Sequence, residues 1–457
     1  MLQRAAHRVP HRLLARHARH RHASTVAVGI SGGVDSAVAA MLLKRQGHDV
    51  VGVHMSNWDS DEDGLGVGCN EQDREDAQRV CAHLGIGFHE VSFQREYWHE
   101  VFEPFLQGYR EGGTPNPDMG CNRHIKFAHF TEHTRRLGAE LVATGHYARL
   151  RRAADGRVQL LAGVDPGKDQ SYALASVRQS ALARTLFPLG ELPKAQVRAL
   201  AAEAGLHVAG KRDSTGICFV GRRNFGDFID GYIEQSPGDF VCVERGEVLG
   251  RHRGLACYTP GQRARLGGRA QPLYIVRKEP ATNSIVVCEG ADHPALLCRE
   301  LRAGPPTHWV AGEAPAALQG GAEGGVLRCE ARVRYQQPLV RCEVRAADTS
   351  AASHGHGRVG RGGGAGGEAT DDAVGAASVE LLAKFAQPMP HVAEGQAFVL
   401  YDGEVCLGTA DIVARGPSLY DERQMQMQQA RQNQQHQRQQ RQLSTHPSTT
   451  RGEAVIQ

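Results

Sequence analysis

Residues 31–36, Ser-Gly-Gly-Val-Asp-Ser, have the composition of a phosphate-binding loop. They follow the apolar run VAVGI and precede a helical pattern that Gly47 ends. Consecutive small residues let backbone N–H groups converge on one point, and the helix start behind them adds a favourable dipole. The Gly-Lys-Ser/Thr ending of a Walker loop and a GxGxxG fingerprint are both missing. A tight turn alone would explain one glycine, but it poorly explains two flanked by serines and an aspartate.

A second polar segment, Thr114-Pro-Asn-Pro-Asp-Met-Gly-Cys-Asn122, leads into an Ile-Lys-Phe run. Its two prolines stiffen the backbone, so that Asn116 and Asp118 are held at fixed angles. Cys121 is expected at the start of the next helix, where the helix dipole favours a thiolate. The alternative is a rigid loop in which Asp118 caps that helix. These residues alone do not separate the two interpretations.

The third segment, residues 213–221, reads Asp-Ser-Thr-Gly-Ile-Cys-Phe-Val-Gly. Cys218 stands between a polar turn and an apolar run. On local sequence alone, a simply buried cysteine is the favoured interpretation.

The combination of the three segments changes that interpretation. The loop SGGVDS resembles the pyrophosphatase-loop ATP family, whose members adenylate a substrate oxygen. With the NPDxxCNxxIKF and DSxGICFxG patterns, residues 25–415 resemble the tRNA-specific 2-thiouridylases of bacteria and mitochondria. The pattern departs near its end, where Glu394 replaces a usual proline and residues 407–410 replace a run of glycines.

The resemblance implies an ATP site and a tRNA site. The ATP-binding residues would be Gly29, Ile30, Ser31, Gly32, Gly33, Val34, Asp35, Ser36, Met55 and Gly145. The tRNA anticodon stem-loop would contact Asn116, Pro117 and Asp118 at the target base, and His146, Lys168, Asp169, Gln170, Arg334, Tyr335 and Gln396 elsewhere. Gln396 is the contact that the departure at Glu394 affects most.

The implied reaction is ATP-dependent 2-thiolation of the wobble uridine in tRNAs of the Lys, Glu and Gln types. Adenylation makes the uridine C2 oxygen a leaving group, with Mg²⁺ and the loop N–H groups offsetting the charge of pyrophosphate. Cys218 would receive a persulfide from an upstream cysteine desulfurase or sulfur carrier. Cys121 would then either free sulfide from it or close a disulfide with Cys218 after direct transfer. Asp118 would act as acid or base.

Other chemistries fit parts of this pattern. An amidotransferase or lysidine-type ligase would keep the phosphate loop but would not need both cysteines. A tRNA-binding scaffold without activity would need neither the phosphate loop nor the two cysteines. An iron–sulfur cluster held by Asp118, Cys121 and Cys218 is not favoured, because the clustered spacing of such sites is absent. No other metal ligand set is predicted.

Alternating short strands and helices over residues 25–222 predict a parallel sheet covered on both faces. With the resemblance, this becomes an α/β nucleotide-binding domain of the adenine nucleotide alpha hydrolase type. Short β-rich segments then predict a small middle domain over 223–294 and a C-terminal β-barrel over 295–415. A Gly-rich insert, 346–377, and a Gln/Arg-rich tail, 416–457, are expected to be disordered.

The chain has 457 residues and a formal net charge of +3, but its basic excess is local. Residues 1–24 carry six arginines and no acid, which is typical of an organellar transit peptide. We expect the protein to be imported into the mitochondrial matrix, with the plastid as the alternative destination. A basic RNA-binding arm would have the same composition. No apolar run is long enough for a membrane span, so no membrane partner is expected.

Two further compositional features bear on function. Eleven cysteines without a CxxC pair argue against a disulfide framework or zinc ribbon. The densest basic stretch after the leader comprises Arg263, Arg265, Arg269, Arg277 and Lys278. It fits an RNA-binding surface and an ordinary solvated surface equally well.

Overall fold

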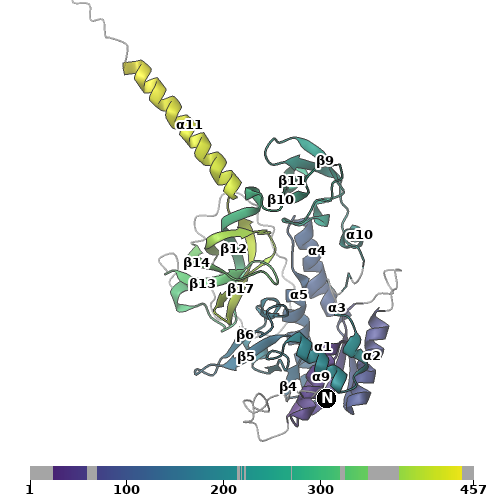
Figure 1. The fold of residues 1–457 in the computed structure, drawn as a ribbon. Coiled ribbons are helices and arrows are strands. Elements are labelled where there is room, and N and C mark those ends of the chain that lie inside the picture. Colours follow the sequence, from purple (N-terminus) through teal and green to yellow (C-terminus); the bar gives the residue numbers. More distant parts are fainter. Residues whose placement is uncertain are drawn as a thin grey trace, which may run out of the picture.

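Strands and helices alternate from Thr25 onward, as the hydrophobic pattern predicts. The computed structural model describes residues 24–58, 69–213, 217, 219–220, 223–268, 270–319, 325–347 and 380–444. Figure 1 shows three units along the chain, an α/β domain, a small β-rich domain and a barrel. The predicted fold class is therefore confirmed.

The first unit is built on a five-stranded sheet in the order β3-β2-β1-β4-β7. All of its pairings are parallel. The strands are β1 (Thr25–Gly29), β2 (Asp49–Ser56), β3 (Gly87–Ser92), β4 (Leu141–Ala143) and β7 (Thr185–Leu186). Because β1 is central, the loop that follows it lies where neighbouring strands also end.

Helices cover both faces of this sheet. Along β1, Val26 and Val28 pack on the side of α1 (Val34–Arg45) and α2 (Cys69–Leu84), whereas Ala27 packs on the opposite side. The α1 side also holds α9 (Lys194–Glu203) and η3 (His207–Gly210). Alternate residues of one strand thus enter two cores, as expected for a doubly covered parallel sheet.

Two longer helical runs form the opposite side. One comprises α3 (Gln94–Tyr97), η1 (Trp98–Phe102) and α4 (Glu103–Arg110), and the other α5 (Pro117–Gly120), η2 (Cys121–His129) and α6 (Phe130–Arg136). Both contain π-helical turns, which often occur at functional sites. The short helices α7 (Ser171–Leu174) and α8 (Gln179–Leu182) complete the unit.

The middle unit is a four-stranded sheet in the order β10-β11-β8-β9, preceded by α10 (Phe225–Asp230). Its strands are β8 (Gly238–Cys242), β9 (Val248–His252), β10 (Leu273–Glu279) and β11 (Ser284–Glu289), with the 3₁₀ turns η4 (Leu255–Cys257), η5 (Pro280–Thr282) and η6 (Pro294–Leu296). The helix and the four strands lie inside the predicted domain, 223–294, whereas η6 runs to Leu296.

The C-terminal unit is a closed barrel in the order β12-β15-β14-β13-β16-β17, because β17 also pairs with β12. Its strands are β12 (Leu297–Trp309), β13 (Leu327–Arg332), β14 (Val340–Ala347), β15 (Glu380–Pro390), β16 (Ala397–Asp402) and β17 (Val405–Arg415), with the 3₁₀ turn η7 (Ala316–Leu318). Most of the Gly-rich insert lies outside the described residues, but Ala346 and Ala347 belong to β14.

A hairpin of the first unit joins the barrel sheet. Strands β5 (Ala148–Arg152) and β6 (Val158–Ala162) pair with each other, and β6 pairs with β17. The predicted boundary at residue 222 therefore does not separate the two sheets. Backbone pairing between residues so far apart in sequence leaves no local signal.

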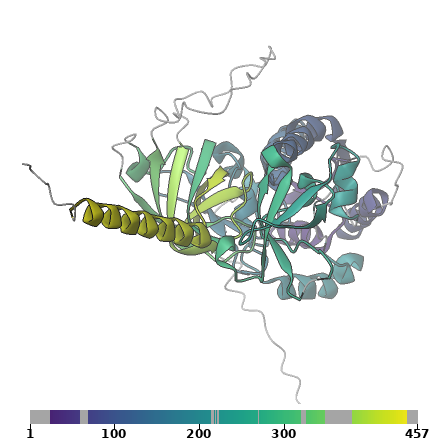
Figure 2. The same cartoon turned by 90° about the horizontal axis from the view of Figure 1, so that it is seen from above.

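The tail expected to be disordered contains a helix, α11 (Leu419–Ser444). Figures 1 and 2 show it projecting away from the barrel. The expectation is wrong for residues 419–444, because Gln, Arg and Met favour helix and no Gly or Pro interrupts the run. Residues 1–23 and 445–457 lie outside the description. No described helix is both long and apolar enough to cross a membrane.

Candidate functional site

The predicted phosphate loop connects β1 to α1. Ser36 in the first turn of α1 closes the loop, since its Oγ accepts from the Ser31 N–H at 3.1 Å and donates to the Gly33 carbonyl at 3.2 Å. Gly33 is the N-cap residue of α1, and no side-chain hydrogen bond caps the helix. The first N–H groups of a helix need acceptors from outside it, and a phosphate supplies them.

At two positions around the loop only glycine fits, because a side chain would collide with neighbouring backbone. Gly32 has φ +72°, and a Cβ on it would lie 2.2 Å from the Asp73 carbonyl oxygen. A Cβ on Gly145 would lie 2.7 Å from the Ser36 nitrogen. Gly145, two residues after the end of β4, therefore packs directly on the start of α1.

The remaining predicted ATP-binding residues gather at the same edge. Gly29 ends β1, and a Cβ on it would lie 3.1 Å from the Cε of Met55 near the end of β2. Ile30 is buried, and its carbonyl oxygen lies 2.9 Å from the Nδ1 of buried His54. The carboxyl ends of parallel strands are where such folds bind nucleotides.

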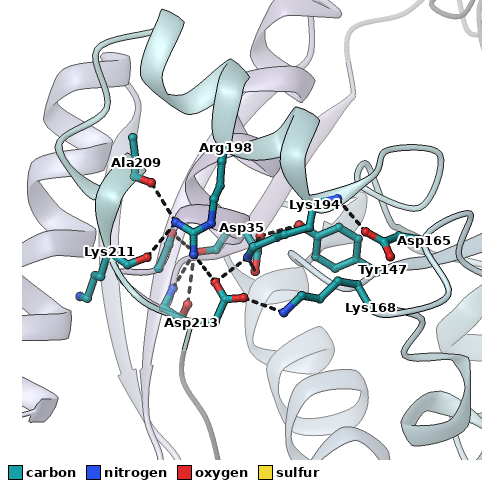
Figure 3. A network of polar contacts seen from close by, with 12 residues as sticks. Asp35, Tyr147, Asp165, Lys168, Lys194, Arg198, Ala209, Lys211 and Asp213 are labelled. Carbon is teal, nitrogen blue, oxygen red and sulfur yellow. Dashed lines mark hydrogen bonds and ion pairs between the residues drawn. The ribbon is translucent and has the colours of Figure 1, made fainter. Parts of the chain in front are cut away.

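A network of ion pairs adjoins the loop, and Figure 3 shows its side chains pointing toward one another. The Lys194 ammonium lies 2.7 and 2.8 Å from the two carboxylate oxygens of Asp35, and 2.8 Å from Asp213 Oδ1. Lys168 and Arg198 also contact Asp213, each at 2.6 Å. Burial would raise the pKa of Asp213, but Lys168 and Lys194 lower it to about 2.

Lys211 supports the loop from another direction. Its ammonium donates to the Gly32 carbonyl at 3.0 Å and to Asp73 and Asp76 at 2.7 and 2.5 Å. Sequence analysis missed Lys194 and Lys211, because a lysine at the start of an amphipathic helix or after a turn has no distinctive pattern.

The target-base loop is fixed by Asn116. Its Oδ1 accepts from the Asp118 N–H at 3.1 Å and so caps α5, which begins at Pro117. Asp118 itself does not make the predicted cap, and its side chain reaches the surface. Desolvation by the surrounding protein nevertheless raises the pKa of Asp118, with Lys126 opposing the shift.

Cys121 is buried one turn inside this helical run, not at its start as predicted, because Pro117 begins the helix. Cys218 lies outside the described residues, but its neighbours Ile217 and Phe219 pack in the same hydrophobic cluster as Cys121. Phe219 lies within 5.1 to 5.5 Å of the rings of Phe102, Phe105 and Trp58. The two cysteine motifs therefore share one core.

Several predicted tRNA contacts have partners inside the protein. Lys168 pairs with Asp213, and the Gln170 side chain accepts from the Tyr147 N–H at 2.9 Å. Asp169 is buried and binds Arg332 at 2.7 Å and the Ser171 N–H at 3.0 Å. In this structure the segment joins the first unit to the barrel.

The other predicted contacts differ in exposure. Tyr335 is 42% exposed, whereas Arg334 donates to the Pro260 carbonyl. Gln396 donates to the Thr114 carbonyl at 2.6 Å. His146 is buried beside Phe127 and Phe187, and its Nδ1 lies 2.7 Å from the Thr144 hydroxyl. Contact of His146 with tRNA would require its exposure.

The basic stretch of the middle unit is not one surface. Arg263 and Arg265 are exposed, and Arg277 pairs with Glu279 at 3.0 Å. Lys278 instead turns inward and donates to the Gly113 carbonyl at 2.8 Å, and burial lowers its pKa to about 8. Arg269 lies outside the described residues.

No three His, Cys, Asp or Glu side chains in the described ranges come together as a possible metal site. Nine cysteines of the described part are free thiols, namely Cys81, Cys121, Cys242, Cys257, Cys288, Cys298, Cys329, Cys342 and Cys406. Because Cys218 is not described, the iron–sulfur alternative stays untested.

The parallel sheet, the uncapped helix start and the loop of small residues define a nucleotide-binding α/β protein. Residues 24–222 match the tRNA methyl transferase HUP domain model, residues 226–289 the tRNA methyl transferase PRC-barrel domain model, and residues 374–412 the aminomethyltransferase beta-barrel domain model. These matches follow the three units in order.

Relatives that match along most of their length show which nucleotide-binding α/β family this is. The tRNA-specific 2-thiouridylase MnmA of Methylococcus capsulatus is 46% identical over 389 residues, covering 84% of this chain and 94% of the relative. Those of Cupriavidus taiwanensis and Alkaliphilus oremlandii are 45% and 42% identical, covering 84% and 85% of this chain and 98% and 96% of the relatives. The chain belongs to the tRNA-specific 2-thiouridylase family.

Proposed function

We propose that this protein is an ATP-dependent sulfurtransferase that replaces the C2 oxygen of the wobble uridine in certain tRNAs with sulfur. The observation that carries the proposal is the pairing of a phosphate-binding loop with two cysteine motifs whose described neighbours share one core. An amidotransferase or lysidine-type ligase would need only the loop.

ATP would bind with its phosphates at the start of α1, where N–H groups lack a side-chain cap. The uridine C2 oxygen attacks the α-phosphorus, pyrophosphate leaves, and an adenylated C2 results. Lys194 and Lys211 both contact the loop, and they would offset the negative charge that collects there. Mg²⁺ would accompany ATP as part of the substrate. Asp35, the carboxylate in the loop, would be the residue to hold it.

Sulfur would then come from a persulfide on Cys218. Its terminal sulfur attacks C2, and AMP leaves with the bonding electrons. In one route the Cys121 thiolate then attacks the Cys218 sulfur, which closes a Cys121–Cys218 disulfide and leaves the sulfur on C2. An external thiol must reduce that disulfide before the next turnover. In the other route, Cys121 first frees sulfide from the persulfide.

Asp118 is the described carboxyl closest in sequence to Cys121, and its raised pKa suits proton transfer. Asn116, Pro117 and Asp118 would meet the target base, which must leave the anticodon stack to expose C2.

The decisive test uses purified full-length protein, unmodified tRNA, ATP and a cysteine desulfurase as persulfide source. Cys218→Ser and Cys121→Ser should each abolish 2-thiouridine, measured by nucleoside mass spectrometry. Both should retain tRNA-dependent pyrophosphate release, since adenylation needs neither thiol. Cys257→Ser is the matched control, because Cys257 is a half-buried thiol of the middle unit and should be dispensable.

Two results would contradict the proposal. A uridine that gains a methyl group in place of sulfur would point to methyl transfer, and thiolation that survives Cys218→Ser would remove the persulfide route. Activity proportional to bound iron after anaerobic purification would replace the persulfide with an iron–sulfur cluster while keeping the substrate.

We also propose that residues 1–24 direct the protein to the mitochondrial matrix, with the plastid as alternative. The support is compositional, since six arginines occur there without an acid. N-terminal sequencing of organelle-purified protein should find a start near Ser24. An intact Met1 in a cytosolic pool would contradict it.

A further inference from the structure

Two buried cysteines of the barrel face each other. Cys329 of β13 and Cys342 of β14 lie directly opposite in the antiparallel register, and their Sγ atoms are 3.7 Å apart. Both belong to the hydrophobic core of the barrel, and they are 9% and 4% exposed. Figure 1 shows their strands side by side. Each cysteine alone is explained as a small core residue, but packing does not require that two sulfurs meet, and the proposed sulfur transfer uses neither thiol.

The register of the two strands suits a disulfide bond between these cysteines. Opposite residues of antiparallel strands have Cα atoms about 4.5 to 5.5 Å apart, within the span of about 4.4 to 6.8 Å that disulfides bridge. The sulfurs must approach from 3.7 Å to about 2 Å. The Cβ atoms must also approach, since they are about 4.5 to 5.5 Å apart across such strands and about 3.5 to 4.5 Å apart in a disulfide. The bond can therefore form, but it draws the two strands together locally.

The cysteine pair lies at the base of a hairpin that carries two of the predicted tRNA contacts. Residues 333–339 connect β13 to β14 and include Arg334 and Tyr335. Tyr335 is 42% exposed, whereas Arg334 donates to the Pro260 carbonyl of the middle unit. The hairpin loop therefore presents one side chain to solvent and uses its neighbour to hold the loop in place.

The same hairpin is fastened to the first unit. Arg332, three residues beyond Cys329, binds buried Asp169 at 2.7 Å, and Gln336 donates to the Gly167 carbonyl at 2.8 Å. In addition, β13 pairs with β16 and β14 pairs with β15, so neither strand can move as a whole. A pull at the cysteine pair must therefore be taken up along the hairpin, toward its loop.

We propose that Cys329 and Cys342 are a redox-sensitive thiol pair whose disulfide weakens the binding of tRNA. The bond shifts the base of the hairpin, and the loop that carries Arg334 and Tyr335 loses its position against the other two units. Reduction of the bond restores both the thiols and the loop. The effect on tRNA rests on the proposed function, whereas formation of the disulfide does not.

The oxidant is a hydroperoxide, and hydrogen peroxide is the simplest one. The sulfur of Cys329, the more exposed of the two, attacks a peroxide oxygen, which forms a sulfenic acid and releases water. The sulfur of Cys342 then attacks the sulfenic sulfur, and a second water leaves. Two thiols and one hydrogen peroxide thus give one disulfide and two waters, and an external thiol reverses the change by exchange. The hydrogen bond with Cys329 and burial raise the pKa of Cys342, so the second step is slow and needs sustained peroxide.

The first measurement asks whether the bond forms. The full-length protein is reduced, freed of reductant, exposed to hydrogen peroxide and then blocked with N-ethylmaleimide. Trypsin cleaves after arginine, which precedes both cysteines, so it releases Cys329–Arg332 and Cys342–Arg345, each with one cysteine. Mass spectrometry without reduction should find these two peptides linked, and dithiothreitol should separate them.

The second measurement compares the affinity for tRNA before and after oxidation. Every protein compared carries Cys121→Ser and Cys218→Ser, so that oxidation of those two thiols cannot contribute. Oxidation should raise the Kd for tRNA several-fold, and dithiothreitol should restore it. Cys342→Ala should abolish the response.

Two further variants guard this comparison. Cys329→Ala removes the other half of the pair and serves if Cys342→Ala melts at a lower temperature when reduced. Cys406→Ala is the matched control, because Cys406 is buried in the same barrel but lies opposite Tyr401, and its loss should leave the response intact.

Three results would overturn the proposal. One is the absence of the linked peptides after sustained exposure to peroxide. Another is linked peptides together with unchanged or tighter binding of tRNA. The third is a response that persists in both Cys329→Ala and Cys342→Ala, which would assign it to another oxidised group. Thiolation by the reduced, unaltered protein tests the proposed function separately.

Discussion

Gly145 lies directly against Ser36, and a Cβ added to it would come 2.7 Å from the Ser36 nitrogen. Real Cβ atoms do not approach backbone so closely, so a side chain here must displace the start of α1. That displacement would misalign the N–H groups that face the phosphates.

Gly145→Ala should therefore raise the KM for ATP by at least about tenfold, or about 1.4 kcal/mol, without abolishing the fold. Steady-state pyrophosphate release at varied ATP measures this. Gly267→Ala is the control, because a Cβ there meets open space. An unchanged KM in Gly145→Ala would show that α1 does not bind the nucleotide.

Asp118 should govern the acidic limb of the pH–rate profile. Desolvation raises its pKa, and Lys126 opposes the rise. If the carboxylate is the base, the rate falls as pH drops through a pKa above the usual aspartate range. Asp118→Asn should lower kcat roughly 10²- to 10⁴-fold and remove that limb.

Lys126→Met tests whether Asp118 is the group that titrates in the acidic limb, through the direction in which the limb moves. Without the opposing charge the pKa of Asp118 rises further, so the acidic limb should move to higher pH. A limb that stays in place in both variants would assign the titration to another group. Single-turnover thiolation across pH separates this step from product release.

Asp213 should stabilise the fold in a pH-dependent way. Its pKa is lowered to about 2, so its contribution is present above the unfolded pKa and is lost as pH falls from about 4 to about 2. Asp213→Asn should cost on the order of 2 kcal/mol near neutral pH, measured by urea unfolding. The difference from the unaltered protein should shrink through that window.

Asp155→Asn is the control for this experiment. Asp155 is an exposed carboxylate paired with Arg157, and solvent screening leaves such pairs little weight. Equal losses in the two variants, or a difference that persists at low pH, would count against the network around Asp213.

The first turn of α11 should stabilise the middle unit on which it packs, and the rest of the helix should not affect stability. The Asp421 carboxylate accepts from the Ser418 N–H at 3.0 Å and from its hydroxyl at 2.6 Å, and Tyr420 packs on a cluster that includes Val276 and Leu296. A chain ending at Gln424 should keep its thermal stability and thiolation. One ending at Pro417 should melt at lower temperature.

RNA binding by α11 is the competing outcome. A loss of tRNA affinity beyond about tenfold, or about 1.4 kcal/mol, in the chain ending at Gln424 would show that the removed arginines bind RNA. The full chain would then also show the steeper salt dependence.

The sequence by itself determined the chemistry of the local segments. Two glycines between serines and an aspartate are readable as a phosphate loop because the requirement is steric and lies within six residues. The fold class was readable for a similar reason, since strand and helix periods are local. Cys121 and Cys218 stood out from nine other cysteines only through the motifs around them.

The tertiary structure decided which charges meet. Lys194 and Asp35 are 159 positions apart, and Lys168 and Asp213 are 45 apart, so no spacing rule connects them. Lys168, a predicted tRNA contact, also pairs with Asp213, and Lys278, which belongs to a basic stretch, turns inward. A long side chain can reach several partners, and only packing around its stem selects one.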